Sequence, residues 1–242
     1  MKGLTGLFSE LIENYKRKIA YNCWVKDNEK KFHANMRLAE EYRRYYPEQL
    51  PKLSKIFGRQ AQARLINQWH EREEREGLRG QPNVMLFDQW SQIGPNGENG
   101  YDYLKEYAPT RPLENGYDII LPWPWNEHRS CKCFQYIGIE EGKRDWQADS
   151  NHSIEFWMPM GIGWVYSGNH SLTVGIIEGI GSIPNYKAVD MSSLYDHVYC
   201  DGRFYRRTLD DQVINRVRDV SIASIFEVGR LINKHLDWRD RQ

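Results

Sequence analysis

A glycine followed by three polar residues marks the point where an apolar run gives way to a helical pattern. Gly168 ends the run, and Asn169, His170 and Ser171 come directly after it. A glycine at such a turn lets the N–H groups of a helix start point at an anion, which the helix dipole also attracts. We therefore expect side-chain donors from Asn169 and His170. The N–H groups of Ser171 and Leu172 would complete a phosphate cradle. The alternative is an ordinary strand-to-helix turn with Asn169 or Ser171 as the N-cap.

Two groups of residues with metal-binding side chains occur before this turn, but neither has the spacing of a metal site. The first consists of His128, Cys131 and Cys133. A Cys-x-Cys pair without a second Cys/His pair does not match structural zinc. The second consists of Asp149, His152 and Glu155. These would share one face of a helix, yet the following residues favour a strand, which would separate them. The sequence therefore predicts no metal centre.

Two tryptophans flank a proline in a predicted turn and are candidates for stacking on a ligand. Trp123 and Trp125 stand on either side of Pro124. Aromatic faces stack on nucleobases with little sequence preference, although core packing explains most tryptophans equally well. Because a turn buries side chains less completely than a strand, we keep these two as the ligand-stacking candidates.

The region around the glycine turn resembles a known superfamily. Residues 163–189 read GWVYSGNHSLTVGIIEGIGSIPNYKAV, a strand, a glycine turn, a small-residue helix closed by glycine, and a further strand. This arrangement resembles the phosphate-binding segment of the ParB/sulfiredoxin-like superfamily. Residues 118–129 read DIILPWPWNEHR and are similar to the opening motif of that family, in which an arginine faces the nucleotide or phosphate. The resemblance thereby implies a phosphate-binding role for Arg129.

The resemblance implies a function as well as a fold. It suggests binding of a nucleotide or nucleic acid at the Gly168–Ser171 loop, with His170 as donor or general acid and Asn169 orienting the phosphate. Phosphodiester or nucleotide hydrolysis, as in a nuclease, and Mg²⁺ accompanying a nucleotide are within the range of the family. One position departs from the pattern, because Ser171 stands where the family usually has arginine. A hydroxyl cannot replace the bidentate contacts of a guanidinium. The departure leaves open a non-catalytic DNA- or protein-interaction protein.

The elements that must position these residues divide the chain into three parts. Residues 1–76 show two amphipathic helical patterns before Pro47 and a third from Lys52 to Glu76, which has Ile56 among its inward positions. Residues 77–116 carry Gly, Pro and Asn clusters and read as a long connection with short elements. Residues 117–242 would form the ParB/sulfiredoxin-like domain. The expected fold class is α+β, a small mixed sheet with packed helices behind a helical N-terminal region.

Within residues 117–242, the patterns predict a strand at 117–121 and two strands or a bent one over 154–166. A helix over 169–181 and a strand over 182–190 follow. Asp201 and Gly202 indicate a hairpin. Apolar residues from Leu209 to Ile232 predict a closing helix that ends near Asp237.

Charge is distributed unevenly along a chain whose formal net charge is zero. Residues 1–80 carry an excess of six basic charges and residues 81–200 an excess of eight acidic charges. A polyanion or a protein partner would therefore meet the N-terminal helices, unless these charges simply form a solvated surface. No stretch of the sequence has the pattern of a signal peptide or a spanning helix, and four scattered cysteines indicate reduced thiols. We expect a cytoplasmic protein without membrane contact.

Overall fold

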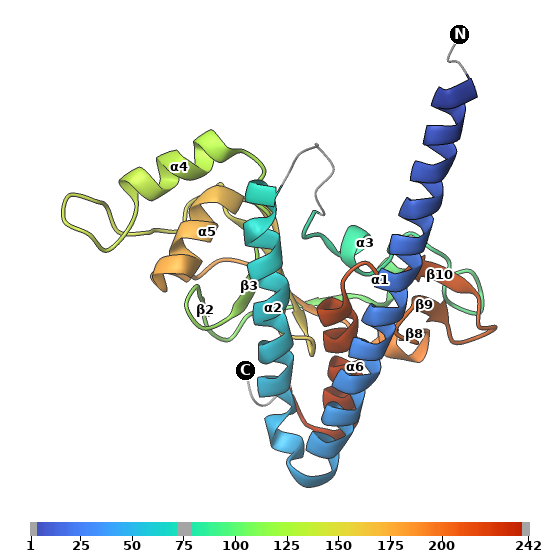
Figure 1. Cartoon of the computed structure of the whole chain (residues 1–242). Coiled ribbons are helices and arrows are strands. Elements are labelled where there is room, and N and C mark those ends of the chain that lie inside the picture. Colours follow the sequence, from blue (N-terminus) through green and yellow to red (C-terminus); the bar gives the residue numbers. More distant parts are fainter. Residues whose placement is uncertain (1–3, 72–78, 239–242) are drawn as a thin grey trace.

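A five-stranded mixed sheet lies between two layers of helices in the computed structural model, which describes residues 4–71 and 79–238 (Figure 1). The strand order is β1-β7-β4-β5-β3. These strands span Lys105–Tyr107 (β1), Ile119–Leu121 (β3), Ser153–Met158 (β4), Ile162–Ser167 (β5) and Lys187–Asp190 (β7). β3 runs parallel to β5 and β4 parallel to β7, whereas β4 and β5 are antiparallel. The predicted α+β class with a mixed sheet and N-terminal helices is confirmed.

The N-terminal region begins with one long helix. α1 spans Leu4–Tyr45 and is followed by the 3-10 turn η1, Pro47–Gln49, and by α2, Leu50–Glu71. The prediction of two separate helices before Pro47 is wrong, because residues 20–31 between the two patterns contain neither glycine nor proline to interrupt a helix. In α2, Leu53, Phe57 and Leu65 are buried as predicted, but Ile56 is exposed. Residues 72–76, the predicted end of this helix, lie outside the described residues.

Short elements connect α2 to the sheet. They are α3 (Pro82–Met85), η2 (Gly100–Tyr103), the edge strand β1 and β2 (Leu113–Glu114). Met85, Leu86 and Phe87 are completely buried. The segment that reads as a connection in the sequence thus contributes both a strand and core side chains.

Alternation along the strands buries both faces of the sheet. Trp157 and Trp164 lie in the cluster that also contains side chains of α1, α2 and α6 (Val220–His235). Phe156 and Val165, their neighbours along β4 and β5, lie in a second cluster with Leu172 of α5 (Asn169–Glu178). Because successive side chains of a strand point to opposite faces, each strand supplies both cores. α2 and α6 lie on one side of the sheet, with α1 packed against α6, and α4 (Glu127–Tyr136) and α5 lie on the other side (Figure 1).

Two smaller sheets complete the fold. β2 pairs with β6, Ser182–Ile183, so only β7 returns from the predicted strand at 182–190 to the main sheet. β8 (Val198–Cys200) and β9 (Phe204–Arg207) form the hairpin predicted at Asp201 and Gly202, and β10 (Val213–Arg216) pairs beside β9. The closing helix therefore starts later than predicted. Leu209 is exposed in the turn after β9, and Val213 opens a strand.

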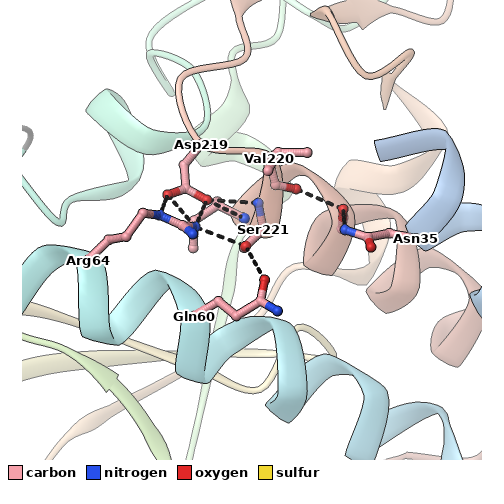
Figure 2. A network of polar contacts seen from close by, with 8 residues as sticks. Asn35, Gln60, Arg64, Asp219, Val220 and Ser221 are labelled. Carbon is pink, nitrogen blue, oxygen red and sulfur yellow. Dashed lines mark hydrogen bonds and ion pairs between the residues drawn. The ribbon is translucent and has the colours of Figure 1, made fainter. Parts of the chain in front are cut away.

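A polar network closes the N-terminus of α6 (Figure 2). One carboxylate oxygen of the N-cap residue Asp219 accepts the N–H groups of Ser221 and Ile222 at 2.8 and 3.0 Å. Arg64 of α2 donates to the same carboxylate from Nε at 2.9 Å and from Nη2 at 2.7 Å. The Ser221 hydroxyl in turn lies 3.1 Å from Gln60 Oε1. These bonds tie the start of α6 to α2.

No helix in the described parts of the chain is long and apolar enough to cross a membrane.

Candidate functional site

The turn at Gly168 joins β5 to α5 with the geometry that the sequence predicted. β5 ends at Ser167 and α5 begins at Asn169. Gly168 has φ +84°, in the left-handed region that favours glycine. A Cβ placed there would lie 2.5 Å from Cδ2 of His152, so the turn also needs the space that glycine leaves. The helix start is thus held by backbone geometry, since its N-cap makes no side-chain hydrogen bond.

Three backbone N–H groups are open at the start of α5. Leu172 N–H donates to the Gly168 carbonyl at 3.0 Å, which removes it from the predicted cradle. The N–H groups of Asn169, His170 and Ser171 make no hydrogen bond with the described residues. An anion at this terminus would therefore meet the first three residues of the helix rather than Ser171 and Leu172.

The Asn169 side chain has a structural contact. It is buried, and its Oδ1 accepts the backbone N–H of Trp123 at 2.8 Å. The Trp123 indole donates to the Val165 carbonyl at 2.9 Å and packs on the core, so it is not available to stack on a ligand. Asn169 and Trp123 together hold the connection after β3 against the connection after β5. This contact brings α4 and α5 side by side.

His170 is the least satisfied polar side chain of the loop. Its Nδ1 lies 3.1 Å from the Ser130 hydroxyl of α4. The same hydroxyl lies 3.1 Å from the Asn126 carbonyl, and when its single hydrogen points there, Nδ1 carries the ring proton and donates to Ser130 Oγ. Nε2 is buried and has no hydrogen-bond partner among the described residues. Nε2 is therefore the ring atom that remains open to a ligand.

Trp125 lies beside the ring of His170, and Arg129 lies over Trp125. The rings of Trp125 and His170 have centroids 5.5 Å apart, and the Arg129 guanidinium lies 5.1 Å from the Trp125 ring centroid. Arg129 forms no ion pair with a described carboxylate and is exposed, as is Trp125. Burial, and secondly the charge of Arg129, lower the pKa of His170 below its ordinary value. A neutral imidazole beside an unpaired cation results.

Ser171 belongs to a second, closed set of hydrogen bonds. Nδ1 of His152 accepts the backbone N–H of Asp149 at 2.9 Å and also lies 2.9 Å from Asp149 Oδ1. Nε2 donates to Ser171 Oγ at 2.8 Å, and this hydroxyl donates to the Gly168 carbonyl at 3.2 Å. Ser171 therefore holds the loop in place and has no hydrogen left for a ligand.

The structure thus separates the predicted site residues into two groups. His170, Arg129 and Trp125 lie together at the open start of α5, whereas Asn169, Trp123, Ser171 and Leu172 hold the loop around Gly168. Two residues that orient these side chains were not predicted from the sequence: Ser130 orients His170, and His152 orients Ser171. The repeated tripeptide Asn-His-Ser at 151–153 and 169–171 was the available signal for His152, since the histidine of the first copy bonds the serine of the second.

Neither of the two ligand-type groups before the turn forms a metal centre. In the described residues, no three His, Cys, Asp or Glu side chains are arranged to hold a metal ion. Cys131 and Cys133 are free thiols on α4, and burial raises the pKa of Cys133. Glu155 accepts from the Trp157 indole and the Tyr166 hydroxyl at 3.1 Å each, whereas His152 bonds Asp149 and Ser171.

Comparison with known protein families gives a match over most of the chain. A family model described as "Family of unknown function (DUF6710)" matches residues 18–237, which include the sheet, α4 and α5. No curated protein and no solved structure matches the chain.

Proposed function

The chain belongs to the DUF6710 family, a family of unknown function, and we propose that it binds a phosphate-bearing ligand, a nucleotide or nucleic acid, at the start of α5. The observation that carries the proposal is the state of His170. Its ring is oriented by Ser130 and Trp125, yet its Nε2 is buried without a partner among the described residues. A buried polar atom without a partner costs free energy, which a ligand contact would recover.

The groups around His170 suit a phosphate. The open N–H groups of His170 and Ser171 lie at the positive end of the helix dipole, and Arg129 adds a full charge that no carboxylate of the described residues neutralises. Trp125 is exposed beside them and offers a face for a nucleobase. The glycine turn, small-residue helix and neighbouring strands also support a relation to the ParB/sulfiredoxin-like superfamily.

Protonation of His170 couples to binding in this proposal. A bound phosphate favours the charged imidazolium, which donates to it from Nε2. A histidine charged in this way can act as a general acid toward a leaving group, and Mg²⁺ accompanying a nucleotide would offset the phosphate charge. If the protein is an enzyme, the reaction would be hydrolysis of a phosphodiester or nucleotide. The free thiols fit a cytoplasmic setting.

A second candidate function has a specific observation in its favour. Ser171 stands where the resembled family has arginine, and its hydroxyl is occupied by His152 and Gly168. The loop then keeps its shape without a principal cation. In this case the protein would be a non-catalytic module whose basic N-terminal region contacts DNA or a protein.

A binding screen tests the proposal. The probes are ATP, AMP and a short single-stranded DNA, each with and without Mg²⁺, and the readout is thermal stability followed by calorimetry on any hit. A probe at 100 times its dissociation constant stabilises the native state by about 2.7 kcal/mol. His170→Ala and Arg129→Ala should each weaken binding at least tenfold while the melting temperature changes little.

Arg203→Ala is the matched control. Arg203 is exposed and lies 5.3 Å from the ring centroid of Phe204, much as Arg129 lies over Trp125, but it belongs to the β8–β9 hairpin. Its removal should leave binding unchanged. If His170→Ala lowers the melting temperature by many degrees and leaves binding intact, His170 is a core residue and the proposal fails. Binding that requires residues of α1 but not His170 would favour the second candidate.

A further inference from the structure

A cavity of about 240 Å³ opens at the end of β5 opposite to the His170 loop. Gly161, just before β5, lines this cavity, whereas Gly168, just after β5, begins the candidate site. The strand has six residues, which at about 3.3 Å per residue places the two regions roughly 20 Å apart. The cavity is therefore separate from the candidate site at His170.

The inner walls of the cavity are mostly apolar. Phe156 and Met158 of β4, Met160 after it, Tyr186 before β7 and Trp238 after α6 all line it. An apolar cavity of about 150 Å³ can hold one benzene molecule. The volume here accommodates a ring and several further atoms. Thioether and aromatic walls suit a planar apolar group, because polarizable surfaces pack well on its faces.

Among the described residues that line the cavity, one cation has no carboxylate beside it. Arg111 also lines the cavity, but it donates to both oxygens of the buried Asp118 carboxylate at 2.8 and 2.7 Å, and this pair is neutral. Lys55 of α2 has no carboxylate within ion-pair distance among the described residues. Its Nζ lies 3.0 Å from the centroid of the Tyr117 ring. The described residues that line the cavity therefore carry one net positive charge.

We propose that this cavity binds a small carboxylic acid with a planar apolar body. Its carboxylate pairs with Lys55, and its body packs between Met158, Phe156 and Trp238. A phosphate suits the site poorly, because the guanidinium of Arg111 that could grip it bidentately is already held by Asp118. A neutral apolar ligand would leave the ammonium of Lys55 with the Tyr117 ring as its partner and without an anion. A monoanion matches both the charge and the walls.

The test compares two probes of nearly equal shape. 3-Phenylpropionate carries the carboxylate, and 3-phenylpropanamide is its neutral counterpart. Each probe is titrated with the full chain, and binding is monitored by ligand-observed NMR. The acid should bind at least tenfold more tightly than the amide. Lys55→Met should reduce the affinity for the acid to that for the amide. Lys52→Met is the control, since Lys52 is exposed on the same helix and does not line the cavity.

Other outcomes overturn the proposal. Equal binding of acid and amide to the wild-type chain would show that Lys55 does not select a charge, and this result needs no variant to fold. Absence of binding of either probe at about 10 mM would remove the site altogether. Met158→Trp should fill the cavity and weaken both probes, and unchanged affinities in that variant would place the ligand elsewhere.

Discussion

The helices α5 and α6 begin in opposite ways, although each follows a strand and a short turn. At α6, the carboxylate of Asp219 accepts two N–H groups of the first turn, and Arg64 stands behind it. At α5, the cap is Gly168, which has no side chain, and the first three N–H groups remain open. α6 therefore contains its own anion, whereas α5 has none among the described residues.

The closed start of α6 shows what the open start of α5 lacks. Both starts have a helix dipole, and each has an arginine from a neighbouring helix, Arg64 from α2 and Arg129 from α4. At α6 a negative oxygen lies between the N–H groups and the guanidinium. A ligand phosphate at α5 would occupy the equivalent position between the N–H groups of His170 and Ser171 and the charge of Arg129. The attraction of an anion to a helix N-terminus and an arginine thus stabilises the fold at α6, and at α5 it would bind a ligand.

The largest effect should follow from opening the closed helix. Asp219→Ala removes the N-cap and leaves Arg64 and two N–H groups without their partner, so we expect a loss of about 3 kcal/mol in the free energy of unfolding. Urea denaturation would measure it. Asp219→Asn keeps a cap oxygen but loses the charge, and it should cost about 1 kcal/mol. Equal costs for the two variants would show that the charge, rather than the cap, holds α6.

A smaller effect should follow from adding a side chain to the open turn. Gly168→Ala places a methyl group 2.5 Å from the His152 ring at φ +84°, so it should cost about 2 kcal/mol and disturb the bond from His152 to Ser171. Gly142→Ala is a close control. Gly142 has φ +83°, but a Cβ there would meet no atom within 4 Å. Strain alone predicts about 1 kcal/mol. If urea denaturation shows the same loss of stability for both variants, the contact of the added methyl group with the His152 ring costs no free energy.

Turn chemistry made the open helix predictable from the sequence. Gly168 and Gly179 both adopt left-handed φ values, of +84° and +68°, at the two ends of α5, and this is the conformation for which glycine is selected. Periodicity was less reliable. It divided α1 at a stretch without any helix breaker, and it began the closing helix at Leu209, since apolar residues of a turn and of β10 matched helical spacing by chance.

The contacts that divide the site residues could not be read from local patterns. Ser130 meets His170 across 40 residues of sequence and His152 meets Ser171 across 19. α4, which carries Ser130 and Arg129, was not predicted as a helix, because the sequence around it shows a proline turn rather than an apolar stripe. Only the packing of α4 against α5 shows which of the predicted donors remains open.

The smallest effect concerns the proton on His170, and its sign differs between the empty and the occupied site. In the unfolded chain the pKa of this histidine is about 6.5, and burial and Arg129 lower it in the folded chain. The unfolded chain therefore binds more protons in the interval between the two pKa values. The stability that the neutral ring contributes is present above pH 6.5 and is lost as the pH falls through the folded pKa.

His170→Gln isolates this contribution, because every other titrating group cancels when wild type and variant are compared at the same pH. Without a ligand, the stability of wild type relative to His170→Gln should decrease from pH 7.5 to pH 5.5 in chloride. In sulfate of the same ionic strength, the decrease should become smaller or reverse, because a dianion at α5 favours the imidazolium. Urea midpoints in the two salts measure both changes. A difference that is independent of pH in chloride would show that the ring is not desolvated. The same decrease in both salts would show that no anion reaches Nε2, and the start of α5 would then be as closed in function as that of α6.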